Sequence, residues 1–284
     1  MDQNKMEQPQ SQEKIPVTAK RKWIRAITLI AFFYGSIGIA LFYLQEKLLF
    51  HPERLSKDFQ FQFGVPFKEV NIPMNERDTV NMVQFLPSGP AKGVVLYFHG
   101  NKGNIIRFAK YASNFTKNGY EVWMADYPGY GKTTGPMNEA TFYSEATQVY
   151  KLAHSRFGAD SIIVYGKSLG SGVASYLASK QKISRLILET PYYSIPSLFA
   201  LYAPIYPTQR MSHFKFPVGE YLKDVSAPVT IFHGNNDMVV FYRNAKRLRE
   251  SLKKGDEFIT IDGGGHNNLN DYKLFHEKLD SLLK

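Results

Sequence analysis

A serine at the centre of a Gly-x-Ser-x-Gly pentapeptide, residues 166–170, constrains the fold of this chain more than any other feature. A continuous apolar segment, residues 162–165, comes directly before it, and residues 171–180 carry apolar side chains at helical spacing directly after it. A serine on a sharp turn between a buried strand and a helix raises its hydroxyl above the edge of a sheet, and the flanking glycines tolerate the strained backbone. The pentapeptide alone also occurs in ordinary glycine-rich turns, so it is the strand-turn-helix context that predicts a nucleophilic Ser168.

Strand-like and helix-like segments alternate along the rest of the chain. Strands are predicted at residues 68–73, 80–86, 94–98, 121–126, 161–166, 185–189, 229–233 and 258–261, and helices at residues 105–117, 138–157, 171–180, 242–253 and 268–283. Several of the strands are continuous apolar runs, which is typical of strands buried on both faces of a parallel sheet. The alternation predicts an α/β fold with a mostly parallel central sheet of about eight strands and helices on both faces.

Two further polar residues follow predicted strands, where ligands of parallel sheets bind. Asp237 comes after the strand at 229–233, and His266 comes after the strand at 258–261. A serine hydroxyl is a poor nucleophile at neutral pH, so a histidine must take its proton, and an aspartate holds the imidazole tautomer and stabilises the imidazolium. Each residue alone could be an ordinary turn, surface or core residue. Their order after three strands predicts a catalytic triad of Ser168, Asp237 and His266.

The segment after the strand at 94–98 is the candidate oxyanion loop. A developing oxyanion needs two backbone N–H donors, one from the residue after the nucleophile and one from a loop after an early strand. We predict Leu169 and Asn101 as these donors, with Lys102 as the adjacent alternative to Asn101. His99 is interpreted as a buried hydrogen-bonding residue rather than a second base.

Five ordered motifs resemble a membrane-anchored branch of the α/β-hydrolase superfamily that includes protein depalmitoylases and lysophospholipid lipases. They are His99-Gly100-Asn101 with Gly103-Asn104, Asp126-Tyr127-Pro128-Gly129-Tyr130-Gly131, Gly166-Lys167-Ser168-Leu169-Gly170, His233-Gly234 with Asp237, and Gly265-His266-Asn267. The segment Leu-Leu-Phe-His-Pro at residues 48–52 is similar to the linker of that branch. The resemblance covers roughly residues 45–284. It implies the α/β-hydrolase fold and hydrolysis of an acyl ester or thioester through an acyl-enzyme, without metal or cofactor.

An uncharged segment, residues 26–44, precedes the predicted hydrolase domain. As a helix it would be roughly 28 Å long, which is close to the thickness of the hydrocarbon core of a bilayer. The alternative is a cleaved signal peptide, whose apolar region would be about 7–15 residues long. We predict a disordered tail at residues 1–22, an uncleaved single-pass transmembrane anchor at 23–45 and the hydrolase domain at 46–284.

Charge predicts the orientation of this anchor and its surroundings. Six basic residues precede the apolar segment, and the five nearest to it are Lys14, Lys20, Arg21, Lys22 and Arg25. Three follow it within residues 45–57, namely Lys47, Arg54 and Lys57. Positive flanks stay in the cytoplasm, so the N-terminus is predicted to be cytoplasmic and the catalytic domain extracytoplasmic. The net charge of +10 is spread thinly, which favours contact with an anionic membrane surface over nucleic-acid binding. The absence of cysteine excludes disulfides and thiolate metal sites.

Aromatic and aliphatic side chains interrupted by prolines fill residues 195–218. We predict that this segment is a short lid over an apolar acyl pocket and that Tyr192, Phe199 and Tyr202 bind the substrate. The alternative is ordinary packing against the edge of the sheet. A short lid beside a membrane anchor favours lipid-like or acylated substrates.

Two Gly-Lys-Ser/Thr sequences, at residues 131–133 and 166–168, lack the leading glycine of a phosphate-binding loop, so no nucleotide is expected. The sequence thus predicts a membrane-anchored serine hydrolase. Two alternatives remain open: a catalytically silent hydrolase fold that serves as a membrane-tethered interaction module, and a serine peptidase, because the same triad cleaves amides.

Overall fold

The computed structural model describes residues 17–284, and the chain divides into two compact units, Met1–Gln45 and Glu46–Lys284. Helix α1 (Val17–Leu49) begins in the first unit, and its last turn belongs to the second. The predicted tail is therefore wrong for residues 17–22, which are helical, and the rest of that tail lies outside the described residues. Within residues 17–284, Thr18–Leu49 is the one helix whose length and composition would allow it to cross a membrane.

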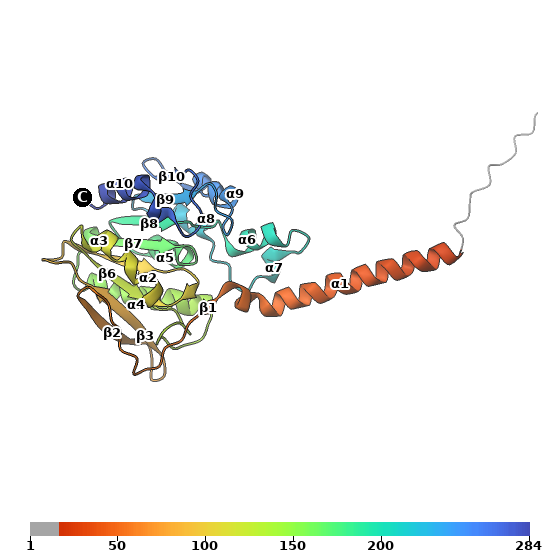
Figure 1. Cartoon of the computed structure of the whole chain (residues 1–284), viewed down its shortest axis with the longest axis horizontal. Coiled ribbons are helices and arrows are strands. Elements are labelled where there is room, and N and C mark those ends of the chain that lie inside the picture. The colour runs from red at the N-terminus through yellow and green to blue at the C-terminus, as the bar shows by residue number, and fades with distance from the viewer. Residues whose placement is uncertain (1–16) are drawn as a thin grey trace, which may run out of the picture. The chain divides into compact units, whose positions relative to one another are not determined.

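An eight-stranded sheet lies at the centre of the second unit (Figure 1). Across the sheet the order is β10 (Glu257–Ile261), β9 (Val229–Gly234), β8 (Arg185–Glu189), β7 (Ile162–Lys167), β4 (Gly93–Phe98), β6 (Tyr120–Ala125), β3 (Thr79–Phe85) and β2 (Phe67–Pro73). β3 is antiparallel to both of its neighbours, and the other neighbouring pairs are parallel. Each predicted strand lies within one residue of its observed bounds, and the mostly parallel sheet is confirmed.

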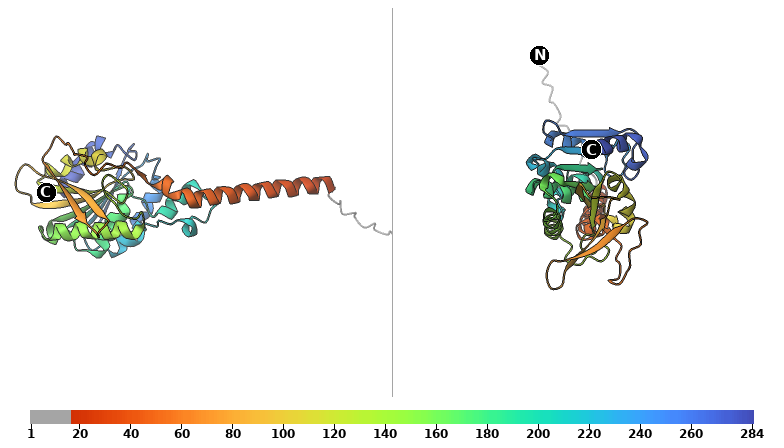
Figure 2. Two further views of the ribbon diagram at one scale, coloured as in Figure 1. Left: turned by 90° about the horizontal axis from the view of Figure 1, so that it is seen from below. Right: turned by 90° about the vertical axis from the view of Figure 1, so that its left-hand side faces the viewer.

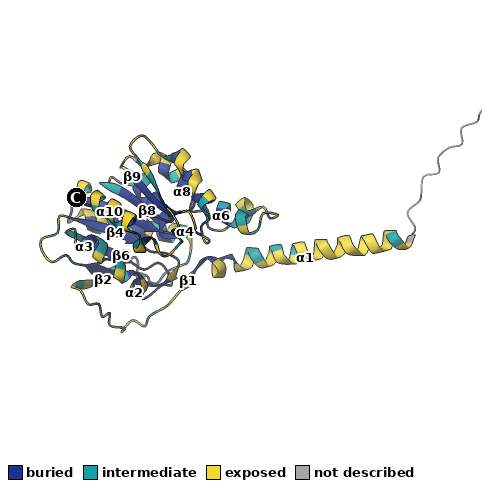
Figure 3. Ribbon diagram, turned by 45° about the horizontal axis from the view of Figure 1, so that its top comes forward, coloured by how far each residue is buried: buried dark blue, intermediate teal, exposed yellow. Residues whose placement is uncertain are grey.

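Helices cover both faces of this sheet, so successive side chains of a central strand enter two separate cores (Figures 1 and 2). On β4, Val94 and Leu96 belong to the core beneath α4 and α5, whereas Val95 and Tyr97 belong to the core on the other face. The six inner strands are buried throughout their middle sections, whereas the edge strands β2 and β10 are mostly half-buried (Figure 3). The helices are α4 (Glu139–His154) and α5 (Gly170–Lys180) on one face, and α2 (Ile105–Phe108), α3 (Ser113–Thr116) and α10 (Lys273–Leu282) on the other.

Three predicted helices are less regular than expected. The segment 105–117 is split into α2 and α3 by a 3₁₀ turn, and there the Ser113 hydroxyl donates to the Lys110 carbonyl, a local side-chain contact that competes with regular helix bonding. The segment 242–253 is α9 (Tyr242–Ala245) followed by 3₁₀ turns. The segment 268–283 begins with a 3₁₀ turn and continues as α10.

Several short elements lie outside the predicted pattern. β1 (His51–Pro52) pairs in parallel with β5 (Lys102–Gly103) and forms a separate two-stranded sheet. The predicted lid segment contains α6 (Ile195–Tyr202) and α7 (Thr208–Met211), and α8 (Val218–Tyr221) begins at its end.

The second half of the lid segment is core rather than lid. Phe214 and Phe216 are buried against Phe142 of α4. The alternative of ordinary packing therefore holds for these two side chains. The first half, α6, buries Ile195, Pro196 and Leu198, and its remaining side chains are half-buried or, at Tyr202, exposed.

Candidate active site

Ser168 occupies a strained turn between β7 and α5. Its φ is 51°, in the left-handed region that few residues other than glycine adopt. The turn also requires Gly170, because a Cβ at that position would lie 2.0 Å from the Phe98 carbonyl oxygen of β4. The glycine-flanked serine predicted from the sequence thus stands at the carboxyl end of a central strand, close against the neighbouring strand.

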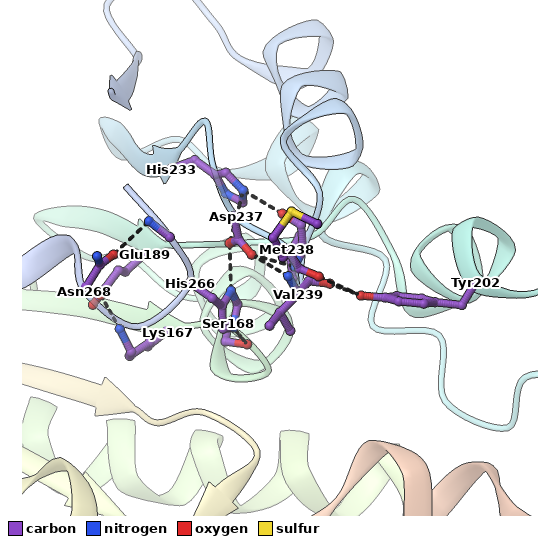
Figure 4. Close-up of polar contacts among 12 residues, drawn as sticks. Lys167, Ser168, Glu189, Tyr202, His233, Asp237, Met238, Val239, His266 and Asn268 are labelled. Carbon is purple, nitrogen blue, oxygen red and sulfur yellow. Dashed lines mark hydrogen bonds and ion pairs between the residues drawn. The ribbon is translucent and has the colours of Figure 1, made fainter. Parts of the chain in front are cut away.

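The structure brings Ser168, His266 and Asp237 into one hydrogen-bonded chain (Figure 4). His266 Nε2 lies 2.8 Å from Ser168 Oγ, and His266 Nδ1 lies 2.7 Å from Asp237 Oδ2. Because Nδ1 faces a carboxylate, the neutral ring carries its proton there, and Nε2 is left to accept from the serine hydroxyl. The N–H groups of Val239 and Val240 each donate to Asp237 Oδ1 at 2.8 Å, which fixes the carboxylate.

The surroundings of Asp237 favour its ionised form. Burial alone would raise the pKa of Asp237, but the hydrogen bond from His266, the two nearby imidazoles and the Val239 N–H together hold the pKa below its ordinary value. His233, which the sequence analysis did not assign to the site, lies 3.4 Å from Asp237 Oδ2 and is fully buried. Burial lowers the pKa of His233, so it is the neutral imidazole that contacts the Val240 carbonyl at 2.9 Å.

A buried ion pair lies beneath the serine turn. The Lys167 ammonium contacts the Glu189 carboxylate, and the Tyr165 hydroxyl donates to the same carboxylate (Figure 4 shows Lys167 and Glu189). The main chain is joined there as well, since the Ser168 N–H donates to the Glu189 carbonyl at 2.8 Å. Glu189 therefore holds both the residue before the serine and the serine itself. No local sequence signal identifies this pair.

The two residues predicted as oxyanion donors both lie close to the serine. Leu169 follows Ser168 directly, and a Cβ at Gly100 would lie 3.8 Å from the Ser168 Cβ, which brings the loop of Asn101 beside the nucleophile. Among residues 17–284, neither the Leu169 nor the Asn101 N–H donates to a protein acceptor. Lys102, the alternative, is the next residue and begins β5.

The interpretation of His99 as a buried hydrogen-bonding residue is confirmed. Its Nδ1 lies 2.7 Å from the Gly100 carbonyl, its Nε2 lies 3.1 Å from Asp126 Oδ1, and the ring has no exposed surface. Burial raises the pKa of Asp126 above its ordinary value, against the opposing effect of the hydrogen bond to His99. Both nitrogens of His99 are thus occupied, one by its own loop and the other by Asp126 after β6.

The three predicted substrate-binding residues lie in different surroundings. Tyr192 is buried behind the serine turn, where its hydroxyl donates to the Leu169 carbonyl at 3.2 Å, so its predicted contact with substrate is corrected to a supporting contact. Phe199 is partly buried against the core. Tyr202 is 57% exposed, and its hydroxyl donates to the Val239 carbonyl at 2.7 Å, which joins α6 to the loop of Asp237 (Figure 4).

No group of three or more His, Cys, Asp or Glu side chains within residues 17–284 is arranged to hold a metal ion. The arrangement of Ser168, His266 and Asp237 with two unengaged N–H groups can activate a hydroxyl, move its proton and stabilise a developing negative charge.

The sequence of this chain is similar to those of known α/β-hydrolase proteins. Residues 93–226 match the family model described as alpha/beta hydrolase fold. Alpha/beta hydrolase domain-containing protein 17C of Xenopus tropicalis is 26% identical over 214 residues, which cover 73% of this chain and 67% of that protein. Alpha/beta hydrolase domain-containing protein aho-3 of Caenorhabditis elegans is 28% identical over 214 residues, which cover 73% of this chain and 61% of that protein.

Solved structures share the same fold. An esterase from Pyrococcus furiosus superposes with a TM-score of 0.62 at 17% identity, over 83% of this chain and 95% of that chain. A soluble variant of monoglyceride lipase from Saccharomyces cerevisiae, in complex with a substrate analog, superposes with a TM-score of 0.61 at 16% identity, over 81% of this chain and 98% of that chain. At these identities the likeness shows the fold alone.

Proposed function

This chain belongs to the α/β-hydrolase family, in the branch of the α/β-hydrolase domain-containing proteins, and from that membership we propose that it is a serine hydrolase. It cleaves carboxylic ester or thioester bonds through Ser168, His266 and Asp237. The observation that carries the proposal is the continuous chain of contacts from Ser168 Oγ to His266 at 2.8 Å and from His266 to Asp237 at 2.7 Å.

In this mechanism, Ser168 Oγ attacks the substrate carbonyl carbon while His266 Nε2 takes the hydroxyl proton. The carbonyl oxygen becomes an oxyanion that accepts hydrogen bonds from the N–H groups of Asn101 and Leu169. Asp237 stabilises the imidazolium, which then gives the proton to the leaving alcohol or thiol, and an acyl-enzyme remains on Ser168. Water, activated by the same histidine, attacks the acyl carbonyl and releases the acid.

The exposed apolar side chains beside the site support a lipid-like or acylated substrate. Met238 and Val239, directly after Asp237, are 69% and 48% exposed, and Tyr202 lies next to them. Such side chains provide contacts for an acyl chain, as does the partly buried Phe199.

We also propose that helix α1 anchors the protein in a membrane. Thr18–Leu49 is long and apolar enough to span a bilayer, and its apolar side chains are exposed along most of its length. The excess of basic residues before it supports a cytoplasmic N-terminus with the hydrolase unit on the opposite side of the membrane.

A fluorophosphonate probe tests the activity in the full chain, in detergent micelles. Wild type should be labelled covalently, and Ser168→Ala should lose the label while its unfolding midpoint stays unchanged. No labelling of the wild type would support the silent interaction module instead. Persistent labelling of Ser168→Ala would show that another residue is the nucleophile.

A substrate series tests the bond and the acyl group. p-Nitrophenyl esters from acetate to palmitate, a palmitoyl thioester and peptide anilides should be compared by kcat/KM. We expect the long-chain ester or thioester to be preferred over the acetate, and Met238→Ser to reduce that preference. Cleavage of the anilides above all esters would favour a peptidase.

A further inference from the structure

The segment that begins at the last residue of α1, residues 49–55, is hydrogen-bonded to the loop that carries Asn101. The His51 N–H donates to the Asn101 carbonyl at 2.9 Å, and the Glu53 N–H donates to the Gly103 carbonyl at 3.1 Å. These contacts form the parallel pair of β1 and β5. We call residues 49–55 the linker segment; it lies wholly within the second unit of the chain.

The linker segment also holds the side chain of Asn101. Asn101 Nδ2 donates to the Leu49 carbonyl at 2.7 Å, and Tyr130 adds a second donor to the Asn101 carbonyl at 2.8 Å. Asn101 is thus fixed through its side chain and its carbonyl, whereas its N–H stays without an acceptor among the described residues. The hydrogen bonds of the Asn101 side chain and carbonyl set the direction in which the Asn101 N–H points.

The peptide that carries this N–H needs such support because glycine precedes it. Gly100 has no Cβ to restrict its backbone, so the Gly100–Asn101 peptide could rotate more easily than most. His99 Nδ1 contacts the Gly100 carbonyl at 2.7 Å, on one side of that peptide. The linker segment fixes Asn101 on the other side. The His99 side chain therefore holds Gly100, and the linker segment holds Asn101.

The linker segment is itself firmly attached to the hydrolase unit. Phe50 is buried, with its ring centroid 4.6 Å from that of Phe214 and 5.6 Å from that of Phe142. Asn104, which caps α2, donates through Nδ2 to the Glu53 carbonyl at 3.0 Å. The segment is packed like core, although it lies at the very start of the predicted hydrolase domain, a few residues after the predicted anchor.

We propose that the linker segment is a positioning element for the oxyanion hole and that hydrolysis depends on its staying docked. This inference rests on the proposed function of Asn101. On this proposal, the segment that joins α1 to the rest of the hydrolase unit helps to hold the active site in place. Displacement of residues 49–55 from the loop removes the restraint on the Asn101 N–H and slows attack at the substrate carbonyl. The start of the hydrolase unit is thereby a point at which activity can be regulated.

The test compares two substitutions at one position in the full-length protein. His51→Pro removes the N–H that donates to Asn101, whereas His51→Ala keeps it and removes only the imidazole. Asn101→Ala provides a second variant, which loses the contact to Leu49 but keeps its own N–H. Each is assayed for kcat and KM with a p-nitrophenyl ester. Each is also assayed for inhibition by an alkyl trifluoromethyl ketone, to which Ser168 adds reversibly: the Oγ–C bond forms, His266 takes the proton and the carbonyl oxygen becomes an oxyanion.

We expect kcat of His51→Pro to lie about tenfold below that of His51→Ala, and Asn101→Ala to fall about as far below wild type, because a misplaced donor weakens oxyanion stabilisation. The Ki of the ketone should rise by the same factor while KM changes less than about twofold, since only the oxyanion-bearing states use this N–H. The unfolding midpoint should stay unchanged.

Equal kcat and Ki in His51→Pro and His51→Ala, together with a wild-type-like Asn101→Ala, would overturn the inference while leaving the hydrolase proposal intact. Losses that follow a lowered unfolding midpoint, with KM and Ki rising together, would also overturn it, because they would reveal a purely structural role. A wild type that neither hydrolyses esters nor binds the ketone would refute the hydrolase proposal itself, and the linker inference with it.

Discussion

Replacing Lys167 by methionine isolates the energetic role of the buried ion pair beneath the serine. The Lys167 side chain is 3% exposed and that of its partner Glu189 is 1% exposed, so neither charge has water as an alternative partner. Methionine is close to the lysine stem in shape and removes the charge. The Glu189 carboxylate is then left in the core with the Tyr165 hydroxyl as its remaining side-chain donor among the described residues.

The expected loss follows from the burial of both charges. Two unit charges about 4 Å apart attract by about 4 kcal/mol at an effective dielectric constant of roughly 20. Removal of one partner from a buried pair costs about 3–5 kcal/mol, because the other charge stays desolvated. We expect Lys167→Met to lower the free energy of unfolding by that amount. The double variant Lys167→Met/Glu189→Gln should recover part of it, because no unpaired charge remains.

Urea unfolding of the full chain in detergent measures this loss, with the fluorescence of the buried Trp123 as reporter and Trp23→Phe as the background, since these are the chain's two tryptophans. The matched control is Lys117→Met. Lys117 pairs with Asp280 at 2.9 Å on the surface, where such pairs contribute about 0.2–1 kcal/mol. If both lysine variants cost the same small amount, or if the double variant is the least stable of all, the reasoning about burial is refuted.

Two further predictions concern buried groups of the same unit. Glu145 has both carboxyl oxygens buried without a hydrogen-bond partner among the described residues, and burial together with the charge of Asp78 raises its pKa to about 9. Because this folded-state pKa lies above the unfolded value, the stability of wild type should fall as pH rises from about 4.5 toward 9. Glu145→Gln should avoid this loss. In urea titrations it should gain about 3 kcal/mol over wild type at pH 7 and almost nothing at pH 4.5. Gly170→Ala should abolish ester hydrolysis and folding yield, since its Cβ would overlap the Phe98 carbonyl, whereas Gly158→Ala, with open space around its Cβ, should match wild type in both measurements.

The features predicted from the sequence are those that a short segment specifies by itself. β4 is a continuous run of apolar residues, and β8 has such a run at its centre, residues 186–188. Runs of this kind define a buried strand to within one residue. The rule that ligands bind at the carboxyl ends of strands then placed Ser168, Asp237 and His266 at one edge, and the structure brings their side chains together. The five-motif resemblance to the α/β-hydrolases is confirmed at the level of the family.

The short elements and some buried side chains have only weak sequence signals or none. The start of α6 does carry one, because Ser194 and Ser197 form a reciprocal cap with Pro196 in the first turn, a pattern that predicts a helix start. β1 and β5 have two residues each, and so short a strand has no periodicity. Burial of Tyr192 and of the second half of the lid segment depends on which surfaces meet in the folded chain.

The contacts that support the proposed site are formed by distant parts of the chain, whereas its chemical groups are marked locally. Glu189 supports Ser168 from the end of the next strand, and Leu49 supports Asn101 from 52 residues away. A strand-end rule finds a nucleophile because the nucleophile's own neighbours must form the turn. The rule cannot find Glu189 or Leu49. Glu189 contributes a buried carboxylate and a main-chain carbonyl, and Leu49 contributes a main-chain carbonyl. Many other residues could present the same groups. Substitutions at such supporting positions should therefore change kcat or stability without changing any recognisable motif, and they test the structure more severely than substitutions in the triad.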